Sequence, residues 1–290
     1  MTPEWIACDW GTSRLRLWAM RGGEPLAATE RDRGMGQLTP SEFPEALEEA
    51  ASIWDGSAPV VACGMVGARQ GWVEAPYVAV PCAPLPGGMV AAPGPREVRI
   101  VPGLSQADPP DVMRGEETQV AGFLALNQGW DGVICLPGTH TKWVHVSAGE
   151  VVSFRTSMTG ELYALLSEQS VLRHSMDETT DDAAFDAAVA DTLSRPERLA
   201  SDLFTLRAAD LLTGATGGRS RLSGLLIGAE LAATRPFWLG QQVAVVGTGD
   251  QGRAYSRALS AQGAPVTQVR SDAVTLAGLT AAWRKSRASA

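Results

Sequence analysis

The chain has 290 residues, of which 45% are hydrophobic and 19% charged, so it can bury a substantial core as one large domain or two ordinary ones. A formal net charge of −8 argues against broad electrostatic attraction to nucleic acid or to an anionic membrane. The start of the chain lacks a charged-then-apolar signal segment, and no apolar run reaches about 18 residues, so we expect a cytoplasmic protein with no membrane partner.

Strands and helices are predicted to alternate from the beginning of the chain. In the first half, the strands are expected over residues 5–9, 15–18, 58–64 and 98–104. Helices are expected over 41–54 and 111–129, and the segment 81–97, dense in Pro and Gly, is expected to be a loop.

The second half continues the alternation. Residues 132–146 predict a strand, a turn and a strand, and residues 159–213 are rich in helix. The remaining elements are a helix with small residues on one side over 223–234, a strand, glycine turn and helix over 241–263, a strand over 265–270 and a helix over 271–283. This alternation indicates an α/β protein.

The cysteines and histidines give no sign of a metal or disulfide framework. Cys8, Cys63, Cys82 and Cys135 are scattered and form no CxxC pair, so we expect buried free thiols. The histidines lack companions at ligand spacing, and a structural zinc site is not expected.

Two segments share one format, in which a strand runs into Gly-Thr, a polar residue and a basic residue, and then into a second strand. They are "DWGTSRLRLW" around Gly11 and "LPGTHTKWVHV" around Gly138, about one domain length apart. Hairpin turns usually favour Asn-Gly or Asp-Gly, so the shared format indicates a duplicated hairpin that faces phosphate. Two ordinary hairpins are the alternative, because Gly favours turns in general.

Both turns carry groups that can bind phosphate, since glycine lets backbone N–H groups approach an anion closely. The side chains that could add to them are Thr12, Ser13, Arg14, Thr139, Thr141 and Lys142. Asp9 precedes the first turn, where a carboxylate would be repelled by phosphate unless a cation bridged them. Mg²⁺ is commonly held by one or two carboxylates, often through water, and by phosphate oxygens. Asp9 therefore indicates Mg·ATP, with a turn-capping aspartate as the alternative.

Phosphoryl transfer also needs a base for the acceptor hydroxyl, and the best candidates are Glu116 and Glu117. They open the helix that leads to the second hairpin. The alternative is a structural role, because the helix dipole favours acids in the first turn. Position in the chain does not separate the two residues.

The segment "VAVVGTGDQG" matches the dinucleotide fingerprint G-x-G-x-x-G, with Asp272 about 20 residues further on. A doubly wound dinucleotide fold needs several more strands, but only a single helix is expected after Asp272. We therefore interpret Gly247, Thr248 and Gly249 as a nucleotide-facing turn of another α/β fold. A plain strand-to-helix connection is the alternative.

Together these motifs resemble the actin-like ATPase and sugar-kinase superfamily and, within it, the 2-dehydro-3-deoxygalactonokinase family. The resemblance spans nearly the whole chain and is carried, in the family's order, by "DWGTSRLRLW", "GMVGARQGWVEAPYV", "VMRGEETQ", "LPGTHTKWV", "MTGELYALL" and "SGLLIGAEL". It implies two ribonuclease-H-like domains with a cleft between them. It also implies ATP-dependent phosphorylation of the terminal C6 hydroxyl of 2-dehydro-3-deoxy-D-galactonate, a step of galactonate catabolism.

The resemblance assigns residues by position. The segments Gly11 to Arg14 and Gly138 to Lys142, which includes His140, would line the phosphates, and Gly247 to Gly249 would face the nucleotide. Asp9 would organise Mg²⁺, through water. Sugar kinases of this superfamily typically keep an Asp after Gly as the base. Here Glu116 follows Gly115 and Glu117 comes next, so the base stays open between the two glutamates.

The acceptor implied by the resemblance is a sugar acid, whose carboxylate is expected to meet an arginine. Arg69 is the first choice and Arg14 the second. Further acceptor contacts are expected from Gln70, Trp72, Glu74, Tyr77, Thr159, Gly160 and Glu161. Plain packing is the alternative for Trp72 and Tyr77, and a helix-opening acid is the alternative for Glu161.

We expect residues 1–114 to form the sugar-acid-binding domain and 115–290 the nucleotide-binding domain, with the last helix, 272–285, packing back across their junction. The domains would close about residues 103–115. One rival function is a kinase of the same superfamily for another sugar or aldonic acid, and the other is a non-catalytic ATP-binding sugar sensor. Apart from the sugar acid and ATP, a homodimer is left open as a partner.

Overall fold

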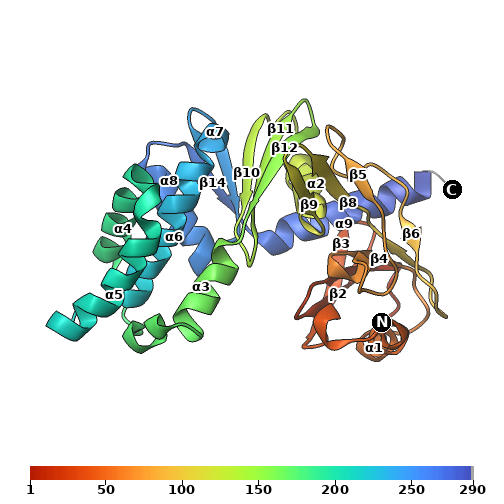
Figure 1. The fold of residues 1–290 in the computed structure, drawn as a ribbon. Coiled ribbons are helices and arrows are strands. Elements are labelled where there is room, and N and C mark those ends of the chain that lie inside the picture. Colours follow the sequence, from red (N-terminus) through yellow and green to blue (C-terminus); the bar gives the residue numbers. More distant parts are fainter. Residues whose placement is uncertain (289–290) are drawn as a thin grey trace. The chain divides into compact units, whose positions relative to one another are not determined.

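The structure is a computed structural model that describes residues 1–288. It contains two compact units (Figure 1). Unit 1 consists of residues 1–131, 146–154 and the described chain from 270 on, and unit 2 of residues 132–145 and 155–269. The division runs through strands β11 (Thr141–Ser147) and β12 (Glu150–Ser157).

A six-stranded sheet forms the centre of unit 1, in the order β3-β2-β1-β4-β7-β6. Its strands are β1 (Trp5–Trp10), β2 (Leu15–Arg21), β3 (Glu24–Arg31), β4 (Val60–Cys63), β6 (Val90–Ala91) and β7 (Val98–Ile100). Neighbours β1, β2 and β3 are antiparallel, whereas β1, β4 and β7 run parallel. The strands predicted in the first half of the chain are present, but β4 is shorter than the predicted 58–64 and β7 is shorter than the predicted 98–104. Strand β3 was not predicted, and β6 lies within 81–97, which was expected to be a loop because it is dense in Pro and Gly.

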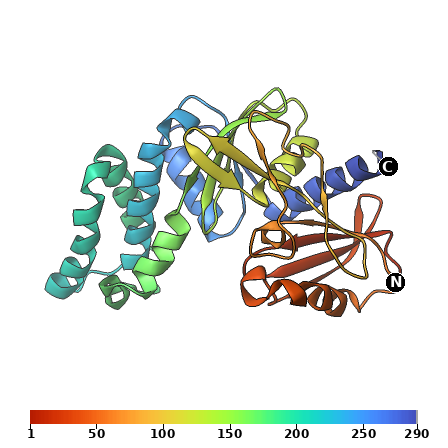
Figure 2. The ribbon, with the colours of Figure 1, turned by 45° about the vertical axis from the view of Figure 1, so that its right-hand side comes forward.

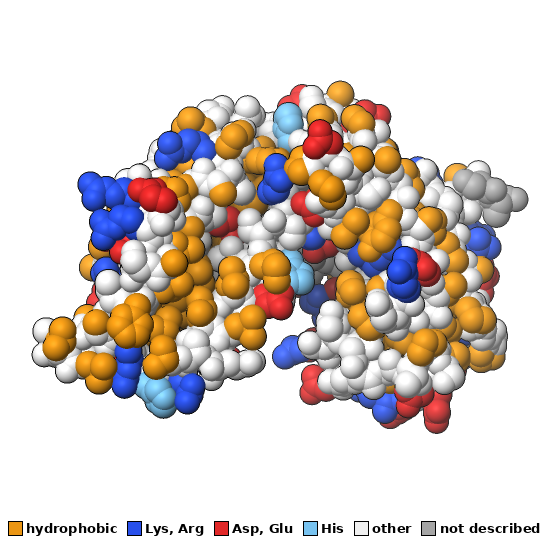
Figure 3. Space-filling view, viewed as in Figure 1, with side chains coloured by type: hydrophobic (Ala, Val, Ile, Leu, Met, Phe, Trp, Pro, Cys, Tyr) orange, Lys and Arg blue, Asp and Glu red, His pale blue; other side chains and the backbone are white. Residues whose placement is uncertain are grey.

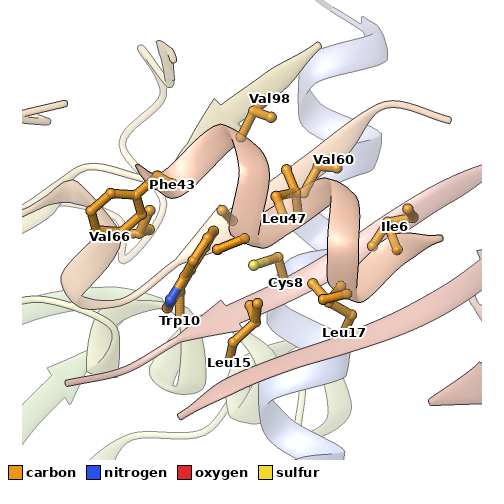
Figure 4. Close-up of a cluster of buried hydrophobic side chains, with 14 of the residues drawn as sticks. Ile6, Cys8, Trp10, Leu15, Leu17, Phe43, Leu47, Val60, Val66 and Val98 are labelled. Carbon is orange, nitrogen blue, oxygen red and sulfur yellow. The ribbon is translucent and has the colours of Figure 1, made fainter. Parts of the chain in front are cut away.

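Strand β1 divides its side chains between two cores, as the alternation of a strand requires. Ile6, Cys8 and Trp10 pack with α1 (Phe43–Ala51), as Figure 4 shows. Trp5 and Ala7 pack on the other side with α9 (Ser271–Ala288). The first and last predicted helices are thus confirmed, and together they cover both faces of β1.

The sheet of unit 2 repeats this strand order. It runs β12-β11-β10-β13-β14, with β10 (Gly132–Leu136), β13 (Val243–Val246) and β14 (Val266–Val269). In both sheets the order begins with the unit's third, second and first strands. In unit 2, β13 then pairs parallel with the first strand, β10, and β14 pairs parallel with β13. The predicted α/β fold with a duplicated, ribonuclease-H-like sheet is therefore confirmed.

Unit 2 is rich in helices, as predicted. They are α3 (Thr159–Glu168), α4 (Asp182–Ser194), α5 (Leu199–Thr213), α6 (Gly218–Ala233), α7 (Arg235–Trp238) and α8 (Asp250–Ala261). Helices α4, α5 and α6 lie side by side in both ribbon views (Figures 1 and 2). A Cβ on Gly224 of α6 would lie 2.5 Å from the Phe185 carbonyl oxygen of α4, so the small residues of α6 face α4.

Unit 1 also contains a three-stranded sheet that the sequence did not predict. Its strands, in the order β5-β8-β9, are β5 (Tyr77–Ala79), β8 (Gly103–Ala107) and β9 (Pro110–Met113). Residues 111–113, expected to be helical, pair with β8, and α2 (Glu116–Leu126) begins only after them. Short strands that contain Pro show too little periodicity to be distinguished from a helix start.

The boundaries of the two compact units differ from those of the predicted domains 1–114 and 115–290. Helix α2, which lies in the second predicted domain, packs against α9 within unit 1. The roles assigned to the predicted domains, and the hinge at 103–115, stay predictions. The four cysteines are free thiols, and three of them are buried. None of the helices in residues 1–288 is both long enough and apolar enough to cross a membrane.

Candidate active site

Asp9 lies near the end of β1, where the two neighbouring strands supply its partners. On β2, Arg16 is the cross-strand neighbour of Asp9 and forms an ion pair with its carboxylate. On β4, Cys63 is the parallel neighbour, and its Sγ lies 4.0 Å from Asp9 Oδ1. Burial raises the pKa of Asp9, and the Arg16 guanidinium opposes that shift. Arg16, which the sequence motifs did not single out, therefore orients the carboxylate.

Two glycines bring the start of α2 to the end of β1. Gly64 follows β4 with a φ of 94°, and Gly115 precedes α2 with a φ of 106°, a region that other residues rarely adopt. A Cβ on Gly64 would lie 2.8 Å from the Trp10 carbonyl oxygen, and one on Gly115 would lie 3.1 Å from Gly64 Cα. The three backbone segments pack directly on one another, so Glu116 and Glu117 begin α2 close to the strand that carries Asp9.

The two glutamates differ in their surroundings. Glu117 is fully buried, and its carboxylate accepts hydrogen bonds from the Gly115 N–H at 2.6 Å and the Thr118 hydroxyl at 2.9 Å. Burial, and then the charge of Glu116, raises the pKa of Glu117 to about 8. Glu116 is partly exposed, and its carboxylate accepts a bond from the Arg114 N–H at 3.0 Å. The two glutamates therefore differ in their exposure to solvent, a difference that their positions in the sequence did not reveal.

The first Gly-Thr turn is closed by a hydrogen bond within its own backbone. The Gly11 N–H donates to the Arg14 carbonyl at 2.9 Å. The side chains of Thr12 and Ser13 are exposed, so their hydroxyl groups are accessible. Arg14 is also exposed and pairs with Glu30 at 2.5 Å.

The predicted acceptor residues of unit 1 lie in the segment between β4 and β5 and at the start of β5. The Arg69 side chain is 79% exposed, and its Nε lies 3.5 Å from the Glu74 carboxylate. Gln70 and Tyr77 are exposed. Trp72 is buried in the α1 core, where it packs as the alternative interpretation expected, and little of its ring is available to an acceptor.

Arg114 directly precedes Gly115 and lies in the "VMRGEETQ" segment, but it was not among the predicted site residues. Only 7% of it is exposed. Its Nη2 donates to the Ala75 carbonyl at 2.7 Å, and its Cζ lies 4.2 Å from the centroid of the Tyr77 ring. Its Nη1 is buried without a hydrogen-bond partner among residues 1–288. Arg114 therefore joins residues 75–77 to the acidic start of α2.

The second Gly-Thr turn, in unit 2, packs against the start of α3. A Cβ on Gly160 would lie 2.1 Å from the Gly138 carbonyl oxygen, so no larger residue fits there without a shift. The Glu161 N–H donates to the Thr139 carbonyl at 2.9 Å, and His140 Nε2 lies 2.6 Å from the Glu161 carboxylate. The structure thus brings the predicted phosphate turn together with residues 159–161.

Several side chains with polar groups next to this turn are buried. The Thr141 and Tyr255 hydroxyl groups are hydrogen-bonded at 2.9 Å, and Lys142 Nζ donates to the Thr156 hydroxyl at 2.8 Å. The Thr159 hydroxyl donates to the Glu230 carboxylate. Thr159 is therefore engaged inside unit 2, and its predicted contact with the acceptor stays a prediction.

The third glycine turn connects β13 to α8, as predicted. Gly247 has a φ of 121°, and Arg253 of α8 donates to the Thr248 carbonyl at 2.8 Å. A cavity of about 810 Å³, a volume typical of small-molecule sites, lies at the start of α8, and Gly247 to Gly249 are not among the residues that line it. Its lining includes Gly138, Thr159, Gly160, Asp250, Arg253 and Tyr255. The second turn and the first turns of α3 and α8 therefore border one cavity within unit 2.

In unit 1 the carboxylates gather around Cys63. Burial, and then the charges of Asp9 and Glu117, raise the pKa of its thiol.

Within residues 1–288, no group of three or more His, Cys, Asp or Glu side chains could hold a metal ion. Mg²⁺ in kinases needs no such cage, since one or two carboxylates with waters and phosphates suffice. The hard oxygen donors of Asp9 at the first turn fit that requirement.

Known proteins resemble nearly the whole of this chain. The model of the family described as 2-keto-3-deoxy-galactonokinase matches residues 9–282. A protein of Rhizobium meliloti (strain 1021), named a probable 2-dehydro-3-deoxygalactonokinase, is 41% identical over 97% of this chain and 96% of its own. The 2-dehydro-3-deoxygalactonokinase of Escherichia coli (strain K12) is 38% identical over 96% of this chain and 97% of its own. A crystal structure from Sinorhizobium meliloti, given the same kinase name, matches 97% of this chain and 96% of its own, with 40% identity and a TM-score of 0.90.

Proposed function

Since this chain belongs to the 2-keto-3-deoxy-galactonokinase family, we propose that it transfers the γ-phosphoryl group of ATP to the C6 hydroxyl of 2-dehydro-3-deoxy-D-galactonate. The products are the 6-phosphate and ADP, and the reaction serves galactonate catabolism. The observation that carries the proposal is the close packing of Gly64 and Gly115, which sets two glutamates close to the strand of Asp9. A kinase needs a base for the acceptor and a carboxylate that organises Mg²⁺.

We assign the base to Glu116. A base must come within hydrogen-bond distance of the acceptor hydroxyl, and Glu116 is partly exposed whereas Glu117 is fully buried. Glu116 takes the proton of the C6 hydroxyl as the oxygen bonds to the γ-phosphorus and the bond to ADP breaks. Glu117 holds the backbone of Gly115 and the side chain of Thr118, and so fixes where α2 begins.

The nucleotide is assigned to the cavity of unit 2. The turn from Gly138 to Lys142 would bind phosphates, and Gly247 to Gly249 would face the nucleotide. The turn from Gly11 to Arg14, with its exposed hydroxyl groups, is the phosphate-binding candidate of unit 1. Asp9, oriented by Arg16, would hold Mg²⁺ through water. When bound, the ion neutralises charge on the phosphates.

The acceptor is assigned to unit 1. Arg69 and Arg14, the predicted partners of its carboxylate, are both exposed and both face a glutamate, which an acidic ligand would have to displace. Gln70, Glu74 and Tyr77 would bind hydroxyl groups of the acceptor. Contacts from Gly160 and Glu161 stay part of this proposal.

A coupled assay of ADP release with 2-dehydro-3-deoxy-D-galactonate tests the reaction. General-base catalysis contributes about 10²- to 10⁴-fold, so we expect Glu116→Gln to lower kcat by at least about 100-fold. Glu117→Gln should lower it less, because that residue acts on the backbone. Both variants should bind ADP as the wild type does.

The gluconate epimer and a neutral sugar serve as controls for the acceptor. If the wild type releases no ADP with the galactonate or the gluconate compound, the proposed substrate is wrong. If Glu117→Gln is the inactive variant and Glu116→Gln is not, the base is Glu117 and the assignment to Glu116 is wrong.

We also propose that the protein works in the cytoplasm as a homodimer. Large apolar side chains of α5 are exposed, with Leu212 at 82%, and Figure 3 shows apolar side chains on the surface of the helical part of unit 2. Exposed apolar patches often mark interaction surfaces. Light scattering of the purified chain measures its mass in solution, and a monomer mass would contradict the dimer.

A further inference from the structure

Helix α6 carries a buried carboxylate, Glu230, that the proposed reaction does not use. Only 5% of the residue is exposed. Its Oε1 accepts a hydrogen bond from Trp143 Nε1 at 2.6 Å, and its Oε2 accepts one from the Tyr255 hydroxyl at 2.7 Å. The Thr159 hydroxyl also donates to Oε2. Donors from β11, α8 and α3 therefore converge on one side chain.

Two of these donors belong to the lining of the unit 2 cavity, namely Thr159 and Tyr255. Thr159 begins α3, whose next residue, Gly160, packs on the carbonyl oxygen of the Gly138 turn. Tyr255 is also hydrogen-bonded to Thr141, the residue at which the turn passes into β11. The turn is thus held through α3 and through Thr141, and both connections end on Glu230.

The chemistry of this network indicates that Glu230 positions its hydrogen-bond partners rather than stabilising the fold. Burying a carboxylate costs free energy, and packed apolar residues in place of buried charges are often equally or more stable. Burial raises the pKa of Glu230, and its neutral hydrogen-bond donors oppose that shift only in part. What the carboxylate provides is the simultaneous placement of three donors from three elements.

We propose that Glu230 is a positioning residue for the nucleotide: its carboxylate fixes Thr159 and Tyr255, and through them the Gly138 turn, in the arrangement that receives the phosphates. This inference rests on the proposed function, which places ATP at that turn. Glu230 acts through its partners rather than by touching the reacting atoms.

The test is ADP binding by isothermal titration calorimetry, with the full chain and its variants. Glu230→Gln keeps the size of the side chain but turns one acceptor into a donor that faces other donors. The loss of one hydrogen bond to a charged group predicts that the Kd for ADP rises about tenfold. Tyr255→Phe keeps the ring, removes the bonds to Glu230 and Thr141, and should raise the Kd about fivefold. The KM for the sugar acid should rise less than the Kd for ADP in both variants, because the Gly138 turn borders the proposed nucleotide cavity, whereas the acceptor is proposed to bind mainly to unit 1.

Thr234→Val is the matched control. Thr234 is buried at the end of the same helix, and its hydroxyl donates at 2.8 Å to the backbone carbonyl of Glu230 rather than to the carboxylate. This variant should lose thermal stability without a change in the Kd for ADP. A role in helix stability alone would give Glu230→Gln the same behaviour.

An unchanged Kd for ADP in both Glu230→Gln and Tyr255→Phe would overturn the proposal, and so would an acceptor KM that rises as much as the Kd. A wild type that binds ADP but does not phosphorylate the sugar acid would overturn the proposed reaction and leave the Glu230 comparison valid. A wild type that does not bind ADP would overturn both.

Discussion

Arg114 is a buried cation between residues 75–77 of unit 1 and the acidic start of α2. Its guanidinium contacts the Ala75 carbonyl and the Tyr77 ring, and its backbone N–H donates to Glu116. The buried Nη1 has no hydrogen-bond partner among residues 1–288. A buried polar group of this kind calls for an explanation, and an anionic acceptor close to it would provide one.

We expect Arg114→Met to raise the KM for the sugar acid about tenfold and to leave the KM for ATP within about twofold. The reason is that the segment carrying Tyr77 loses its connection to α2. Steady-state kinetics with each substrate varied in turn measures both constants. Arg69→Ala is the comparison: the exposed Arg69–Glu74 pair contributes little to stability, so any change there reports on the acceptor alone. If Arg69→Ala raises the acceptor KM more than Arg114→Met does, Arg69 is the principal cation.

Helices α2 and α9 pack with their backbones in direct contact. A Cβ on Gly278 of α9 would lie 1.9 Å from the Thr118 carbonyl oxygen, and one on Gly122 of α2 would lie 1.8 Å from the Val274 carbonyl oxygen. Because α2 begins with Glu116 and Glu117, this contact between helices also sets the position of the acidic residues.

Gly278→Ala is therefore expected to destabilise the protein by about 1–3 kcal/mol, the usual cost of overpacking, although Ala is normally the better helix former. A shift of α2 should also lower kcat. Thermal denaturation and the ADP-release assay measure the two effects. Ala281→Val, at a partly exposed position of α9, should change neither by much. A Gly278→Ala variant more stable than the wild type would show that the helices separate without cost.

For the molecule as a whole, the features that could be predicted from the sequence are those recorded in local patterns. The two Gly-Thr hairpins were recognisable because strand, turn and basic residue follow one another, and the repeated strand order confirms the duplication. The partners of buried polar groups could not be predicted in the same way. Glu230 meets Trp143 from 87 positions away, and Arg114 meets Tyr77 from 37 positions away. Such contacts are fixed by the fold and leave no periodic signal.

The stability of the whole molecule should depend on pH through Glu117. Burial and the charge of Glu116 raise its pKa from the ordinary value of 4.5 to about 8. Between these values the folded chain keeps a proton that the unfolded chain has released. The free energy of unfolding therefore falls as the pH rises, by up to about 1.4 kcal/mol per pH unit. Glu117→Gln cannot titrate, so its stability relative to the wild type should increase from pH 5 to pH 8 and then level off.

Urea denaturation followed by circular dichroism at each pH measures this difference. Glu116→Gln removes one of the two causes of the shift, so its pH dependence should be shallower than that of the wild type without disappearing. Since the proton is held mainly because Glu117 is buried, the effect requires α2 to stay packed, and a packing variant such as Gly278→Ala should weaken it. Parallel pH profiles for the wild type and Glu117→Gln would mean that Glu117 is already ionised in the folded protein at neutral pH.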